Sequence, residues 1–216
     1  MRLKMITGVV LALLGASAGA ANFSFTGSFT RDDDVQLFRF AVAAPSLSTV
    51  TLLTLSYAGG TNAAGSPVPA GGFDPVISLF DATGALIGEA DDGGATSDPV
   101  TGLALDAVLQ IDLTAGDYVA ALTQSPNFAF GPSLADGFEL AGSGNFAGGF
   151  VDAFGNGNPR DGHWALDILS AASASVGAAV PEPPVALLLA VGLAGLAFTG
   201  KDGKTASDDV FPASRA

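Results

Sequence analysis

Aspartates clustered in short, Gly-containing turns are the residues of this chain best suited to chemistry. The clustered acids are Asp32, Asp33, Asp34, Asp74, Asp91 and Asp92. Calcium takes roughly six to eight oxygen ligands from carboxylates, backbone carbonyls and water, and loops of this composition can supply them. The sequence therefore predicts a structural calcium site at these residues, although their spacing does not match an EF-hand. The alternative is that each Asp caps its own turn without a metal.

His163 is the only histidine and a candidate for a general base. Catalysis would require an oriented partner, and Asp161 or Asp167 lies near it in the sequence. A lone His beside Trp164 at the start of a strand is more often structural. The chain contains no Gly-x-Ser-x-Gly or His-Glu-x-x-His motif and no phosphate-binding loop. We therefore predict no catalytic residues and no enzymatic activity, and we interpret Arg160 and Asp161 as a local ion pair or turn.

Composition excludes several other classes of protein. The 216 residues contain no Cys, which excludes disulfides, thiolate zinc sites and Cys nucleophiles. Acids number 21 against 8 Lys and Arg, and the net charge of -13 makes nucleic acid a poor partner. Residues 21–180 hold 17 acids and only three Arg, a net charge of -14. Such a charge suits an extracellular protein that is kept soluble by repulsion or that binds cations.

The central part of the chain has the two-residue period of β-strands, bounded by Gly, Pro and Asp. Strands are predicted at 22–29, 35–42, 49–57, 75–80, 85–89, 107–113, 117–123 and 164–169. No sustained helical period occurs between residues 21 and 180. We therefore expect an all-β ectodomain over 21–178, a jelly-roll-like β-sandwich of about seven to nine antiparallel strands.

Two segments lack this two-residue period. Residues 59–72 are rich in Gly, Ala and Pro and are predicted to form a loop. Residues 124–162 are rich in Gly, Asn and Phe, and we expect a loop pinned onto the sandwich by its Phe side chains, with one short strand around 144–151. The alternative is an exposed aromatic surface for polysaccharide or partner contact.

The N-terminus has the pattern of a secretory signal peptide over residues 1–20. Arg2 and Lys4 precede an apolar run over 5–14, and small residues follow it. The run is too short to span a bilayer core of roughly 30 Å. We expect signal peptidase to cut between Ala20 and Ala21, so that the protein is exported.

The C-terminal segment, 179–216, carries a second apolar run. It contains Val180, Pro181, Glu182 and Pro183, then an apolar helix predicted over 185–198 and a polar tail over 199–216. This arrangement resembles the PEP-CTERM sorting signal. The resemblance implies an exosortase-type transpeptidase as partner, a transmembrane helix that anchors the protein before processing, and a Gram-negative host that makes exopolysaccharide. A plain membrane anchor that stays uncut is the alternative.

The segment from Phe73 to Asp81, with Gly84, Asp91 and Asp92, resembles pre-peptidase C-terminal β-sandwich modules. So does the segment 113–119. Those modules accompany secreted enzymes and bind matrix or calcium, which implies a similar fold here. The segment His-Trp-Ala-Leu-Asp at 163–167 also resembles part of a subset of PEP-CTERM proteins.

These observations predict an exported, non-enzymatic protein of the cell surface or extracellular matrix, associated with exopolysaccharide or biofilm. The alternative is a calcium-dependent carbohydrate- or matrix-binding module. A secreted hydrolase is the third possibility, and it would depend on His163 or Glu139.

Overall fold

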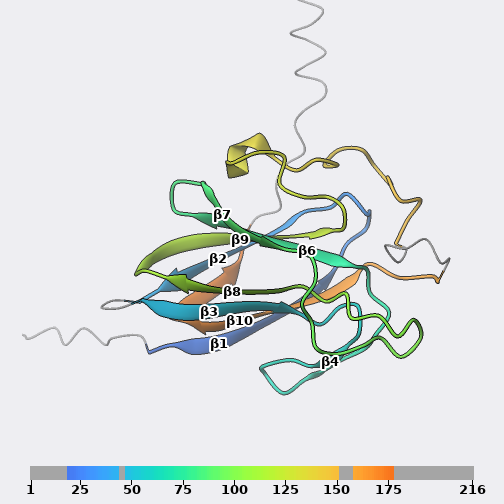
Figure 1. Ribbon diagram of the computed structural model, residues 1–216, viewed down its shortest axis with the longest axis horizontal. Helices are drawn as coiled ribbons and strands as arrows, with labels where there is room; N and C mark the ends of the chain where they lie inside the picture. The colour runs from blue at the N-terminus through green and yellow to red at the C-terminus, as the bar shows by residue number, and fades with distance from the viewer. Residues whose placement is uncertain (1–18, 44–46, 151–157, 178–216) are drawn as a thin grey trace, which may run out of the picture. The chain divides into compact units, whose positions relative to one another are not determined.

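The computed structural model describes residues 19–43, 47–150 and 158–177, which form two antiparallel β-sheets (Figure 1). The four-stranded sheet has the order β1-β10-β3-β8, formed by Ala21–Ser28, His163–Ala171, Ser48–Thr54 and Val108–Leu113. The five-stranded sheet has the order β11-β2-β9-β6-β7, formed by Ser173–Val176, Gln36–Val42, Gly116–Gln124, Pro75–Asp81 and Leu86–Ala90. The prediction of an all-β, sandwich-like fold is confirmed.

Smaller elements lie in the two predicted loops. Strands β4 (Gly60–Thr61) and β5 (Pro67–Val68) form a short hairpin, and Leu134–Asp136 forms a turn of 3-10 helix. No helix in the described ranges is long and apolar enough to cross a membrane. The helices predicted at the two ends of the chain, including 185–198, lie outside the described residues.

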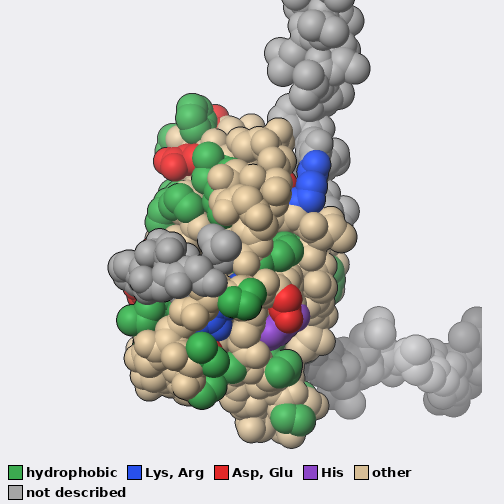
Figure 2. All heavy atoms as spheres, turned by 90° about the vertical axis from the view of Figure 1, so that its right-hand side faces the viewer, with side chains coloured by type: hydrophobic (Ala, Val, Ile, Leu, Met, Phe, Trp, Pro, Cys, Tyr) green, Lys and Arg blue, Asp and Glu red, His purple; other side chains and the backbone are tan. Residues whose placement is uncertain are grey.

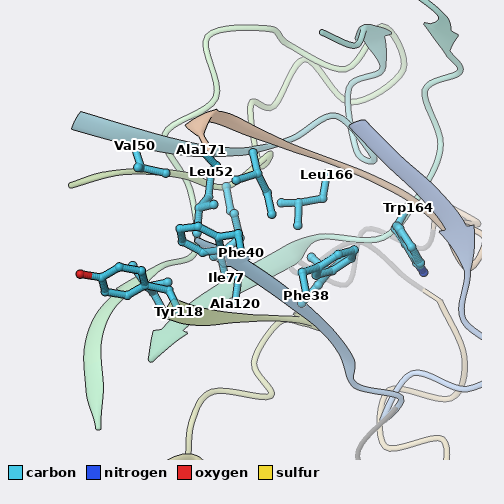
Figure 3. Close-up of a cluster of buried hydrophobic side chains, with 14 of the residues drawn as sticks. Phe38, Phe40, Val50, Leu52, Ile77, Tyr118, Ala120, Trp164, Leu166 and Ala171 are labelled. Carbon is cyan, nitrogen blue, oxygen red and sulfur yellow. The ribbon is translucent and has the colours of Figure 1, made fainter. Parts of the chain in front are cut away.

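The main core lies between the two sheets (Figure 3). In β2, Phe38 and Phe40 point into the core while Arg39 is exposed, as the two-residue alternation predicts. Trp164 of β10 meets Phe38 edge to face, with ring centroids 5.5 Å apart. Gly27 of β1 lies opposite Trp164, and a Cβ there would collide with the indole.

The five-stranded sheet is also covered on its outer face. A second apolar cluster joins Leu37, Phe80, Val119 and Ala121 of this sheet to Phe138 of the long loop. In Figure 1 this loop, coloured yellow, passes over β9 and β7. Every residue from Pro75 to Phe80 is therefore buried, which explains why β6 is apolar on both faces.

The Phe residues of the long loop have several different environments. Phe138 packs edge to face on Phe80, and Phe150 stacks on Phe73 with centroids 5.8 Å apart. Phe130, in contrast, is 70% exposed. The described part of this loop is thus pinned by its Phe side chains. The strand suggested around 144–151 does not form within 144–150, where the backbone makes turns and bends.

Candidate functional site

The topology of the five-stranded sheet brings three loops together at one end of the sandwich. Strand β6 lies between β9 and β7 and is antiparallel to both, so the start of β6 adjoins the ends of the other two. Asp74 immediately precedes β6, Asp91 immediately follows β7, and Ser125 immediately follows β9. The backbone N–H of Ser125 donates to the Asp74 carbonyl at 2.8 Å. Residues far apart in the sequence therefore share one corner of the sheet.

Asp74 is buried at this corner without a compensating partner. Its side chain is 3% exposed, and its Oδ1 has no hydrogen-bond donor. The pKa of Asp74 is raised to about 8, first by burial and then by the charges of Asp91, Asp92 and Asp106, which together outweigh the lowering by the Arg160 charge. The carboxyl therefore holds a proton at neutral pH unless a cation replaces that proton.

Asp91 is the second acid with an unsatisfied oxygen at this corner. Its Oδ1 is buried and accepts no hydrogen bond. Burial raises the pKa of Asp91, the Ser125 hydroxyl lowers it through a hydrogen bond, and the charges of Asp92 and Glu89 raise it. We call Asp74 and Asp91 the corner pair.

Asp106 lies close to the corner pair but is fully occupied by the protein. Its Oδ1 accepts from the Thr54 hydroxyl at 2.9 Å and from the Tyr57 backbone N–H at 3.1 Å. Its Oδ2 accepts from the Ala58 N–H at 2.9 Å. Asp106 therefore fastens the loop after β3. Asp106 was missed in the sequence because no neighbouring acid marks it.

Of the two interpretations of Arg160 and Asp161, a local ion pair or a turn, the ion pair is wrong, because Arg160 pairs with Asp98. Its Nη1 and Nη2 lie 3.2 and 3.0 Å from the two Asp98 oxygens, and both side chains are buried. The guanidinium carbon is 3.8 Å from the Tyr57 ring centroid, a cation–π contact. Burial alone would raise the pKa of Asp98, but the bonds from Arg160 and Thr101 lower it. Arg160 is thus already committed to one carboxylate.

The turn between β1 and β2, which holds Asp32, Asp33 and Asp34, is separate from the corner pair in its contacts. Asp32 Oδ1 accepts from the Phe146 N–H at 2.9 Å, and Oδ2 accepts from the Ala147 N–H at 2.6 Å. These donors lie in the long loop, so the carboxylate pins that loop to the turn. We call Asp32–Asp34 the anchoring turn.

The other two acids of the anchoring turn also bond to nearby groups. Asp33 Oδ2 accepts from the Gly144 N–H at 2.8 Å, and its Oδ1 lies 3.2 Å from Arg31 Nε. Asp34 Oδ2 accepts from the backbone N–H groups of Thr30 and Arg31. Asp34 therefore bonds within its own turn, as the capping alternative describes, whereas Asp32 and Asp33 bond the long loop.

The structure does not assemble the six predicted calcium ligands into one cluster. Within the described ranges, no three His, Asp or Glu side chains are placed to hold a metal ion together. The two groups of acids instead belong to different loops and have different partners. Calcium binding itself stays a prediction.

His163 lies against two acceptors. Its Nδ1 contacts Asp161 Oδ1, and its Nε2 lies 3.1 Å from the Pro69 carbonyl oxygen. A carbonyl can only accept, so a hydrogen bond to Pro69 requires the tautomer with the proton on Nε2. Figure 2 shows the histidine (purple) beside an acidic side chain (red) at the loop end of the domain. Nε2 therefore holds Pro69 of the 59–72 loop to β10, while Nδ1 is engaged with Asp161 just before that strand.

A shallow hollow of about 420 Å³ lies on the outer face of β11, β2 and β9. Its polar lining consists of Arg39, Asp117, Ser173 and Ser175. No ion pair to Arg39 occurs within the described residues, although it lines the same hollow as Asp117. The sequence analysis did not select this surface, because β11 was not among the predicted strands.

The residues expected at the processing points lie at the borders of the described structure. Ala20 is exposed and Ala21 is the first residue of β1, whereas Val180, Pro181, Glu182 and Pro183 lie outside the described residues. Comparison of the chain with family models, with curated proteins and with solved structures gave no match.

Proposed function

We propose that this chain is an exported, non-enzymatic protein of the cell surface or extracellular matrix, sorted by a PEP-CTERM signal in a Gram-negative bacterium that makes exopolysaccharide. The observation that carries the proposal is the position of the sandwich within the sequence. All strands of the described ranges lie between Ala21 and Val176. They fill the interval between the two proposed processing points.

The N-terminal border of the fold supports removal of a signal peptide. Strand β1 begins at Ala21, which pairs with Ala171 of β10, and the proposed cut lies immediately before it. Ala20 is exposed. Signal peptidase would therefore leave β1 intact.

The C-terminal border supports a second cut that spares the domain. The Gly177 N–H donates to the Leu37 carbonyl at 2.8 Å and continues the pairing of β11 with β2. The chain divides into two units between Val180 and Pro181, at the Pro-Glu-Pro. A transpeptidase acting there would release or transfer residues 21–180 with all strands retained.

The strand order supports the finer, jelly-roll form of the sandwich. In a jelly roll, early strands pair with late ones, so that two sheets are wound together from one long hairpin. Here β1 pairs with β10, β2 with β9 and β3 with β8. Strand β11 extends the second sheet beyond β2.

A non-enzymatic role is supported by how the candidate catalytic groups are used. Both nitrogens of His163 face acceptors, Asp161 and the Pro69 carbonyl, and Arg160 is committed to Asp98. A general base needs a free lone pair directed at substrate. The alternative, a carbohydrate- or matrix-binding module, is favoured by the hollow of Arg39, Asp117, Ser173 and Ser175, whose donors and acceptors suit sugar hydroxyls.

The test is the intact mass of the protein recovered from its host, measured separately in the cell envelope and in the medium. We expect a species that starts near Ala21 and ends between Pro181 and Pro183. A species that starts near Ala21 but keeps Ala216 would overturn the transpeptidase step and leave a plain anchor. Saturable binding of the host polysaccharide, lost in Arg39→Ala, would favour the binding module.

A further inference from the structure

The border strands of the two sheets differ in how their free edges are protected. Such a strand presents unpaired backbone N–H and C=O groups that can pair with another strand. The border strands are β1 and β8 of one sheet and β11 and β7 of the other. In β7, the Leu86 N–H donates to the Pro132 carbonyl of the long loop at 2.8 Å, and Glu89 adds a charge. Strand β8 carries the charge of Asp112, and β11 has only four residues.

Strand β1 has none of these protections. It is eight residues long and contains no charged residue and no Pro. Its backbone pairs with β10, and within the described ranges no backbone hydrogen bond joins its other edge to any group (Figure 1). The Ala64 N–H reaches Ser24 Oγ at 3.1 Å, but this contact lies on the solvent face of β1 and not at its backbone edge. The edge of β1 is therefore open to a further strand.

The side chains of β1 favour an identical strand as partner. Phe23 and Phe25 pack against the main core, on the face opposite Ser24. A second β1 that runs antiparallel, with the two Ser24 residues opposite each other, places Phe23 of each copy beside Phe25 of the other, on the core face. On the solvent face, Asn22 lies opposite Thr26. Residues 21–180 have a net charge of -14, yet no charges oppose each other along this contact.

The side of the sandwich that β1 borders also leaves an inward-facing apolar residue uncovered. Val176 of β11 lies opposite Phe38 in the pairing of β11 with β2, so both side chains are on the inner face of their sheet. Val176 is nevertheless 53% exposed, whereas Phe38 is fully buried. The Phe38 ring lies 5.3 Å from the Phe25 ring of β1, centroid to centroid. Val176 and the partly buried Phe residues of β1 therefore form one apolar rim, which a copy docked on β1 would cover.

We propose that two copies of this chain pair through β1, antiparallel and about a two-fold axis. The two four-stranded sheets then join into one continuous sheet. A two-fold contact uses the same surface on both copies, so it closes as a dimer and does not extend into a filament. The proposal goes beyond export and sorting and does not depend on them, because it uses only contacts within the sandwich.

The first experiment is disulfide cross-linking, which is specific here because the chain has no Cys. In the proposed pairing, residue 22 of one copy lies opposite residue 26 of the other, within reach of a disulfide. Two residues 22, in contrast, lie roughly 13 Å apart along the strands, as do two residues 26. Full-length Asn22→Cys and Thr26→Cys are mixed in equal amounts in dilute detergent solution, concentrated, oxidised with copper phenanthroline and run on a non-reducing gel.

We expect about half of the chains in this mixture to be cross-linked, because random exchange places half of them in mixed dimers. Each variant alone should give little cross-linking. The control is a mixture of Asn22→Cys with Gln110→Cys, since Gln110 is exposed on β8 at the opposite border of the sheet. Absence of the 22–26 cross-link, or equal cross-linking in the control mixture, would overturn the proposal.

A second experiment introduces a charge at the edge of β1. Thr26→Lys alters an exposed side chain, and the two-fold axis brings both lysines into the contact. We expect native mass spectrometry of the full chain to show a dimer for the wild type and for Gln110→Lys, and dimerisation at least ten-fold weaker for Thr26→Lys. Near-ultraviolet circular dichroism checks that each variant is folded. Undiminished dimerisation of Thr26→Lys would overturn the proposal, and a monomeric wild type would also do so and leave the edge to a strand of another protein.

Discussion

In the anchoring turn, the Asp32 carboxylate accepts backbone hydrogen bonds from Phe146 and Ala147, whereas at the corner of the five-stranded sheet no donor in the described part of the chain reaches Asp74 Oδ1. Both side chains are buried. At Asp32, protein N–H groups replace the water that the carboxylate loses on burial. At Asp74, no described N–H group does so. Burial of an acid therefore has opposite consequences for stability in the two places, depending on the donors that meet it.

In the buried pair of Arg160 and Asp98, a protein cation compensates the carboxylate. Removal of this cation has the largest expected effect on the free energy of unfolding. Arg160→Met keeps much of the apolar stem but leaves the Asp98 carboxylate buried without its cation, with only the donors of Val100 and Thr101 remaining among the described residues. We expect the free energy of unfolding to fall by about 3–5 kcal/mol in urea denaturation. Arg39→Met is the control, since Arg39 is exposed and no ion pair holds it within the described residues. Equal losses in the two variants would contradict this interpretation.

Removal of the anchoring carboxylate is expected to have the next largest effect. Asp32→Ala leaves the N–H groups of Phe146 and Ala147 without their acceptor. Charge-assisted bonds of this kind are worth about 1.5–3 kcal/mol each, so we expect a loss of about 3 kcal/mol. Hydrogen exchange should also speed up over residues 144–150. A loss below about 1 kcal/mol, with unchanged exchange, would show that the long loop is held by other contacts.

The buried carboxyl of Asp74 should make the free energy of unfolding depend on pH, measured in EDTA. The pKa of Asp74 is about 8 in the folded protein and near its ordinary value when unfolded, so the folded state binds the extra proton between these values. Its stabilising contribution is complete below about pH 4 and is lost as the pH rises through 8. We expect the wild type to lose about 2–3 kcal/mol relative to Asp74→Asn between pH 5 and pH 8. If the free energies of unfolding of the wild type and Asp74→Asn changed in parallel with pH, the raised pKa of Asp74 would be contradicted.

The strands could be predicted because their signal is local. The alternation of Phe38, Arg39 and Phe40 is visible in the sequence, and β2 begins within one residue of its predicted start. Strand β11 was missed because Ser173–Val176 has small residues with little apolar contrast, and only pairing with β2 makes it a strand.

The contacts of the candidate site could be predicted only in part, because many of its residues bind partners that lie far away in the sequence. Nothing near Arg160 in the sequence indicates Asp98, which lies 62 residues away. Likewise, the donors to Asp32 come from a loop more than a hundred residues later. The corner pair did leave a signal, because the β6–β7 register, which pairs Ile77 with Ala90, brings Asp91 two residues from the position opposite Asp74. Hairpin symmetry could therefore have separated them from the anchoring turn.

The most direct test of this account is a paired measurement of the same substitution at both places. Asp32→Asn and Asp74→Asn are each compared with the wild type by urea denaturation at pH 7.5 in EDTA. We predict opposite signs, with Asp32→Asn less stable by about 1–2 kcal/mol and Asp74→Asn more stable by about 1–3 kcal/mol. Destabilisation by both substitutions would contradict the account, because Asp74 would then have a partner within the fold.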